Sequence, residues 1–146
     1  MRGTFYRWIQ IWPEVCKDLC SAPEVLAVGD LHVGNFGTWR DIEGRLCWGV
    51  DDFDECYRLP YTNDLVRLAV SVKIVIESEY LTIKLREACD AILEGYRESL
   101  KNGGRPIVLA EHEKNLERLG VAALDPPDDF WEELNALPAV KHGLPH

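Results

Sequence analysis

The stretch of residues 25–55 constrains the fold most, because acidic side chains follow two short apolar runs within it. The first run, residues 25–28, predicts a buried strand and leads directly into the sequence GDLHVGN. The second run, residues 46–50, leads into DDFDE. Carboxylates this close in sequence repel one another unless a cation or a proton lies among them. The stretch therefore predicts two strand ends that present acidic groups toward one place.

Between the two acidic sequences the pattern predicts a β-hairpin. Its turn, Asp41-Ile42-Glu43-Gly44, ends on a glycine that can adopt the positive φ of a tight turn. We expect the side chains of Asp30, Asn35 and Asp52 to converge on one cleft beside this hairpin.

Most of the remaining chain has helical periodicity, so the predicted fold class is α+β: a small β-hairpin and strand unit plus a mainly helical bundle. We expect a single domain over residues 1–137 and a flexible tail over 138–146, which holds two prolines and two histidines. The expected helices cover residues 5–19, with a kink or restart at Pro13, and residues 65–76, 85–100, 107–119 and 130–137.

The helix over residues 65–76 is apolar on most sides and is expected to be the buried spine of the helical part. Its narrow polar stripe consists of Arg67, Ser71 and Ser78. Thr62 or Asn63 is expected to cap it, and Thr82 to cap the following helix. The residues just before it, 57–61, are expected to be irregular.

Composition excludes some function classes. The net charge of −9 argues against nucleic-acid binding, which needs a basic surface. The longest apolar stretch is interrupted by Arg67 and Lys73 and is too short to span a bilayer, and no signal peptide is apparent. The five cysteines are odd in number and form no CxxC, which favours reduced thiols in a cytoplasmic protein.

The spacing of three polar residues matches the requirements of phosphoryl transfer. Asp30 and Asn35 form a D-x-x-x-x-N pattern, and Asp52 follows after the hairpin. In such a site one carboxylate orients a substrate hydroxyl, an amide oxygen holds Mg²⁺, and a second carboxylate bridges Mg²⁺ to the nucleotide phosphates. Asp54 is a further candidate metal ligand.

Taken together, GDLHVGN, the hairpin, VDDFDE and NDLVRLA resemble the catalytic loop, metal loop and following helix of aminoglycoside phosphotransferases and other protein-kinase-like enzymes. They resemble more closely an uncharacterised bacterial family, catalogued as domain of unknown function 2252, which is thought to share that fold. RGTFYRW near the start and PPDDFWEELNALP near the end extend the likeness over most of the chain.

This resemblance implies roles for individual residues. Asp30 is the expected catalytic base or hydroxyl-positioning group, and His32 orients the loop around it. Asn35 and Asp52 are the expected ligands of Mg²⁺, through which ATP is held. The resemblance also implies that Phe53 packs behind the metal aspartate and that Asp64 buttresses the loop.

The resemblance also implies what the substrates are and which part of the fold is present. A nucleotide and a small-molecule hydroxyl acceptor are the expected partners. The glycine-rich strand turn and the strand lysine that grip the nucleotide in kinase-like enzymes do not occur before Val25. Residues 1–137 therefore resemble the C-terminal lobe of the kinase-like fold, as a piece of a larger protein. Self-association is possible through apolar surface around Phe5, Trp8 and Trp12.

Two other classes compete with the phosphotransferase. Asp30-Leu31-His32 resembles the first metal motif of calcineurin-like metallophosphoesterases, in which two metals activate a water. That class needs a further Gly-Asp pair and a later Gly-Asn-His, which this chain lacks. The third possibility is an inactive binding module, in which the same residues only form turns and helix caps.

Overall fold

The protein is described from a computed structural model. The structure covers residues 4–112, together with residues 115, 116, 118, 121, 132, 135 and 136. Apart from those single positions, the expected helix over 130–137 and the tail over 138–146 lie outside the described residues. The C-terminal part of the expected helix over 107–119 also lies largely outside them.

Within the described residues the chain has the predicted α+β fold. The helices are α1 (Phe5–Val15), α2 (Thr62–Ser78), α3 (Leu85–Lys101) and the short α4 (Leu109–His112), with 3₁₀ turns η1 (Lys17–Leu19) and η2 (Val33–Asn35). The strands are β1 (Glu24–Ala27), β2 (Phe36–Arg40), β3 (Leu46–Val50), β4 (Tyr57–Pro60) and β5 (Ile107–Val108).

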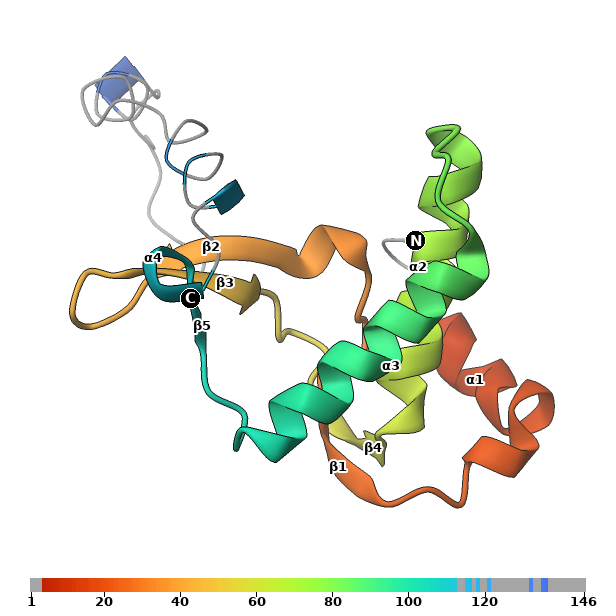
Figure 1. Cartoon of the computed structure of the whole chain (residues 1–146). Coiled ribbons are helices and arrows are strands. Elements are labelled where there is room, and N and C mark those ends of the chain that lie inside the picture. The colour runs from red at the N-terminus through yellow and green to blue at the C-terminus, as the bar shows by residue number, and fades with distance from the viewer. Residues whose placement is uncertain are drawn as a thin grey trace.

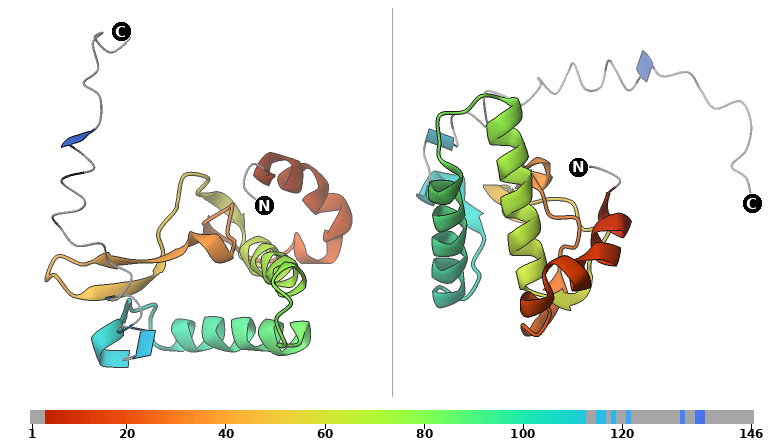
Figure 2. Two further views of the ribbon diagram at one scale, coloured as in Figure 1. Left: turned by 90° about the horizontal axis from the view of Figure 1, so that it is seen from above. Right: turned by 90° about the vertical axis from the view of Figure 1, so that its right-hand side faces the viewer.

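The strands form two small antiparallel sheets, β1-β4 and β2-β3-β5. Helix α2 stands at the centre, between α3 on one side and α1 on the other (Figures 1 and 2). The β2-β3 hairpin extends away from this helical group, and α4 packs against β3 on it. None of the helices in the described part of the chain is long and apolar enough to cross a membrane.

The predicted hairpin is confirmed. Strands β2 and β3 pair from Phe36 opposite Val50 to Arg40 opposite Leu46, and Gly44 in the turn has a φ of +77°. Asp41 closes the turn, because its Oδ1 accepts the backbone N–H of Glu43 at 3.0 Å and of Arg45 at 2.9 Å. The Nε of Arg45 donates to Oδ2 of the same carboxylate at 2.9 Å.

These bonds predict how the turn responds to acid. Desolvation raises the pKa of Asp41, but the N–H bonds from Arg45 and Glu43 and the charge of Arg45 outweigh it, so that the pKa is lowered. The contribution of the carboxylate to the turn is therefore fully present above about pH 3.9, the ordinary aspartate pKa, and is lost as the pH falls through the lower folded pKa.

We expect the carboxyl carbon resonance of Asp41 to titrate with a midpoint below that of a free aspartate, about pH 3.9, and the amide resonances of Glu43 and Arg45 to show a shift with the same midpoint. In Asp41→Asn, which keeps an acceptor oxygen but not the charge, these two amide resonances should lose the shift that has the Asp41 midpoint. A titration midpoint at or above that of a free aspartate would contradict the prediction.

Two expectations about strands were wrong. Residues 57–61 are not irregular, because Tyr57–Pro60 pairs with β1 from Ala27 to Glu24. Proline has no N–H to donate, and Pro60 lies at the end of the ladder, where a missing donor is tolerated. The first apolar run does form a strand, but only Ala27 of β1 is buried, because a two-stranded sheet leaves Val25 and Leu26 exposed.

Helix α2 is oriented differently from the expectation. Its buried residues are polar, namely Asn63, Arg67 and Ser71, and its apolar residues are not the buried spine. The side chains of Leu65, Val66, Ala69 and Val70 instead line an apolar groove of about 300 Å³, opposite Leu85, Cys89, Ile92 and Leu93 of α3. The polar stripe therefore faces the loop after β1, while the apolar stripe faces α3.

The expected helix caps are also wrong. Tyr61 precedes α2 without a side-chain cap bond, and the hydroxyl of Thr62 donates to the carbonyl of Leu19 at 2.9 Å instead. Helix α3 begins at Leu85, after the expected cap at Thr82. The helix expected from residue 107 begins at Leu109, because Ile107 and Val108 pair with β3 as strand β5.

The aromatic helix α1 faces inward. Phe5 and Trp12 are buried and Trp8 is half-buried, so they do not form the exposed apolar surface that was expected around them. Pro13 is accommodated inside the helix, which ends at Val15. The exposed large apolar residues of α1 are Tyr6 and Val15, so that self-association through this helix would have to use them.

Candidate functional site

The loop after β1 is attached to the first turn of α2 by Asp64. Its carboxylate accepts the backbone N–H of Val28 at 2.7 Å and of Gly29 at 3.1 Å. A carboxylate in the first helical turn also interacts favourably with the positive end of the helix dipole. This is the buttressing contact that the resemblance implied for Asp64.

The next residue of the loop, Asp30, is paired with Arg67, one turn further along α2. The Nη2 of Arg67 donates to Oδ1 of Asp30, and the Arg67 side chain is 0% exposed while that of Asp30 is 20% exposed. A charged side chain is almost never fully buried without a partner, so the aspartate compensates the burial of the guanidinium. Asp30 is thus held by Arg67, and its side chain remains partly exposed.

A third contact follows one further turn along the helix, where the Oγ of Ser71 accepts the backbone N–H of Val33 at 2.9 Å. Asp64, Arg67 and Ser71 have the i, i+3, i+7 spacing that places residues on one face of a helix. One helical face therefore holds the loop at three successive points, on both sides of Asp30.

His32 and Asn35 fold the end of this loop onto itself. The Oδ1 of Asn35 accepts the backbone N–H of His32 at 2.8 Å, and the backbone N–H of Asn35 donates to the carbonyl of His32 at 2.9 Å. Asn35 is 2% exposed and His32 is also buried. One lone pair of the Asn35 amide oxygen is therefore used within the loop, and one remains for another partner.

The acidic sequence after β3 lies at the same end of the hairpin as Asn35. The backbone N–H of Asp51 donates to the carbonyl of Asn35 at 2.9 Å, which extends the β2-β3 pairing by one step. The carboxylate of Asp51 lies over Gly37, because a Cβ on that glycine would be 2.1 Å from Asp51 Oδ2. A side chain at residue 37 would displace this carboxylate.

The two loops also meet directly at Gly29. This glycine has a φ of +85°, and a Cβ on it would be 2.2 Å from the carbonyl oxygen of Glu55. Only a residue without a side chain lets the backbones approach this closely. The Asp30 loop and the segment that carries Asp52 and Asp54 are thus packed against each other.

Asp52 and Asp54 are exposed, and Oδ1 of Asp52 accepts the backbone N–H of Asp54 at 3.2 Å. Within the part of the chain that the structure describes, no three His, Cys, Asp or Glu side chains lie close enough together to hold a metal ion. Backbone contacts bring Asp30, Asn35 and Asp52 to one end of the hairpin. That their side chains converge on one cleft stays a prediction.

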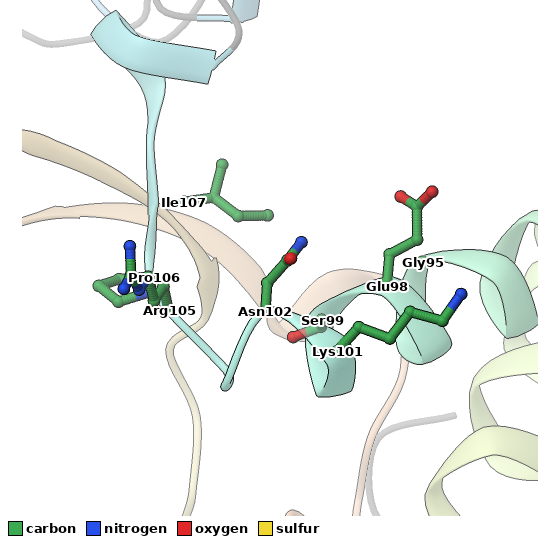
Figure 3. Close-up of a pocket in the computed structure, with 8 residues that line it drawn as sticks. All are labelled: Gly95, Glu98, Ser99, Lys101, Asn102, Arg105, Pro106 and Ile107. Carbon is green, nitrogen blue, oxygen red and sulfur yellow. The ribbon is translucent and has the colours of Figure 1, made fainter.

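Two hollows were compared as possible ligand sites, one beside the candidate site and one away from it. One of about 620 Å³ is lined by Val28, Trp39, Val50, Asp51 and Phe53, beside the candidate site. Phe53 is exposed there. Another, of about 730 Å³, lies between the end of α3 and β5, and its charged side chains Glu98, Lys101 and Arg105 point in different directions (Figure 3). The second hollow therefore has no convergent set of ligands.

The comparison with known families agrees with the motifs. A family model described as an uncharacterised protein conserved in bacteria, DUF2252, matches residues 3–126. The chain belongs to the DUF2252 family. No curated protein and no solved structure matches it.

Two residues of this DUF2252 chain, Arg67 and Ser71, contact the site although the sequence predicted no role there for either of them. A signal for them was present, because both interrupt an otherwise apolar helix at a spacing of four residues. Polar side chains on one stripe of an apolar helix either face solvent or face a buried polar partner. The structure shows the second arrangement, with the loop around Asp30 as the partner.

Proposed function

We propose that this chain supplies the metal and acceptor half of a phosphoryl-transfer site. Asp30 orients the hydroxyl of a small-molecule acceptor. Asn35 and Asp52, with Asp54 as a further carboxylate, would hold Mg²⁺, which would carry the phosphates of ATP. The observation that supports this proposal best is the attachment of the Asp30 loop to three side chains of α2.

Phosphoryl transfer depends on such rigidity. The transfer requires little covalent chemistry from the protein, so that catalysis consists mainly of positioning and charge neutralisation. A carboxylate that is anchored by an ion pair and flanked by anchored backbone keeps one orientation toward an incoming hydroxyl. The side chain of Asp30 is 20% exposed, so that an acceptor could reach it.

The oxygen ligands suit Mg²⁺. One lone pair of the Asn35 amide oxygen is free of the loop bond, and the Asp52 and Asp54 carboxylates are open to solvent. Hard cations such as Mg²⁺ prefer carboxylate and amide oxygens and keep several waters. His32 is buried, and its backbone N–H donates to Oδ1 of Asn35, so that this residue helps to fix the shape of the loop. The five free cysteines support a cytoplasmic location for this activity.

Isothermal titration calorimetry tests the proposal. We expect Mg²⁺ to bind the chain, and Asp52→Ala to weaken that binding at least about tenfold, because a ligand carboxylate is lost. Asp90→Ala, which removes an exposed carboxylate of α3, is the matched control and should leave the affinity unchanged. A subsequent titration with ATP, in the presence of Mg²⁺, tests whether this chain also binds the nucleotide.

Two results would refute the phosphotransferase proposal. Absence of any Mg²⁺-dependent heat in the wild-type chain would favour an inactive binding module. Manganese-dependent hydrolysis of a simple phosphodiester that is lost in His32→Ala would favour a calcineurin-like metallophosphoesterase.

A further inference from the structure

The guanidinium of Arg67 lies over two aromatic rings of α1. Its Cζ is 5.3 Å from the ring centroid of Trp8 and 5.7 Å from that of Phe5. Aromatic faces attract a cation, and the planar guanidinium stacks on them in a way that a lysine ammonium cannot reproduce. Helix α1 therefore provides the walls of the pocket that holds this buried cation.

The polar contacts of Arg67 are few and point to one side. Nη2 donates to Asp30 and lies 3.4 Å from the hydroxyl oxygen of Thr4. Within the described residues, Asp30 is the only carboxylate paired with Arg67, and neither Nε nor Nη1 has a hydrogen-bond partner. The orientation of the guanidinium is thus fixed by the two rings, by a single carboxylate and by the hydroxyl of Thr4.

The two rings are themselves fixed relative to the site. The Nε1 of Trp8 donates to Oδ1 of Asn63 at 2.8 Å, in the first turn of α2. Phe5 is buried, and its Cζ would be 3.1 Å from a Cβ on Gly29, the residue before Asp30. Helix α1 therefore contacts both the helix that carries Arg67 and the loop that carries Asp30.

We propose that Arg67 is a positioning residue for Asp30 and that α1 acts through it. The rings of Phe5 and Trp8 hold the guanidinium, and the guanidinium holds the carboxylate in one rotamer. A displacement of α1 would then release Asp30 while the backbone of its loop stays bound to Asp64 and Ser71. The part of this inference that concerns catalysis rests on the proposed function, whereas the geometry of Asp30 can be measured without it.

NMR of the full chain tests the inference with Arg67→Met, which keeps similar bulk without the charge. We expect the Hα–Hβ couplings of Asp30 to change from values of a single rotamer to averaged values. After correction for any change in global stability, hydrogen exchange at the amides of Val28, Gly29 and Val33 should stay within about threefold of wild type, because Asp64 and Ser71 still hold them. Arg67→Lys should restore the couplings only in part.

Unchanged Asp30 couplings in Arg67→Met would overturn the inference. Equal loss of protection at all three amides, beyond the change in global stability, would also overturn it, since Arg67 would then hold the whole loop and not Asp30 in particular. If Arg67→Met does not fold, Trp8→Leu tests the same inference from α1. There the couplings of Asp30 should average although Arg67 is intact, and wild-type couplings would contradict the proposed role of the helix.

The two proposals fail separately. If the wild-type chain binds no Mg²⁺ while Asp30 becomes averaged in Arg67→Met, the phosphotransferase proposal fails and the positioning role stands. If the wild-type chain binds Mg²⁺ while Asp30 keeps one rotamer in Arg67→Met, only the positioning role fails.

Discussion

Asp30→Ala is expected to lower the free energy of unfolding by about 3–5 kcal/mol, the cost of leaving a buried charge without its partner. Arg67 is 0% exposed, and among the described residues Asp30 supplies its only ion pair. Chemical denaturation, followed by circular dichroism, measures this loss. Asp52→Ala is the matched control, because Asp52 is exposed and its removal should change stability by no more than about 0.5 kcal/mol.

The double variant Asp30→Ala with Arg67→Met separates the ion pair from the rest of the site. Replacing both members of a buried pair by apolar groups is often close to neutral. The double variant should therefore recover much of the stability that Asp30→Ala loses. A double variant as unstable as the sum of the two single variants would show that the pair is not the cause.

Gly29→Ala is expected to lower the free energy of unfolding by about 3 kcal/mol, because alanine is strained at a φ of +85°. Its Cβ would also lie 2.2 Å from the carbonyl oxygen of Glu55, which is backbone and cannot simply rotate away. The two loops of the candidate site would have to separate. Denaturation measures the stability, and the Mg²⁺ titration measures the consequence for the site.

Gly95→Ala is the matched control for this substitution. Gly95 lies inside α3, and a Cβ there would have no atom within 4 Å, so that alanine should stabilise the chain by about 0.5–1 kcal/mol. Similar effects of the two substitutions would contradict the assigned close approach of the two loops.

The features that the sequence predicted correctly are determined over short distances. The hairpin follows from a turn sequence and from the short segments on either side of it, all of which lie within Phe36–Val50. Strand β4 was missed because its partner β1 lies about thirty residues earlier, and nothing within Tyr57–Pro60 indicates that pairing. Antiparallel partners so far apart are chosen by tertiary contacts rather than by local propensity.

In the candidate site, too, the local features could be predicted from the sequence and the distant contacts could not. The positions of Asp30, Asn35 and Asp52 at strand and loop ends could be predicted, since the motif letters are contiguous. The partnership of Asp30 with Arg67 could not, because it depends on which face of α2 points to the loop. Hydrophobicity alone favours burial of the apolar face, and in this chain the buried contacts of the polar face are made by the loop and by α1.

Substitutions on the two faces of α2 have different consequences. Substitutions of apolar residues on the side of α3 alter how the two helices pack, yet they remove none of the bonds from Asp64, Arg67 and Ser71 to the loop. Helix α2 thus separates two parts of the chain. Its apolar side packs on α3, and its polar side holds the loop that carries Asp30. A change in the packing angle of α3 would therefore leave the loop that carries Asp30 bound to α2.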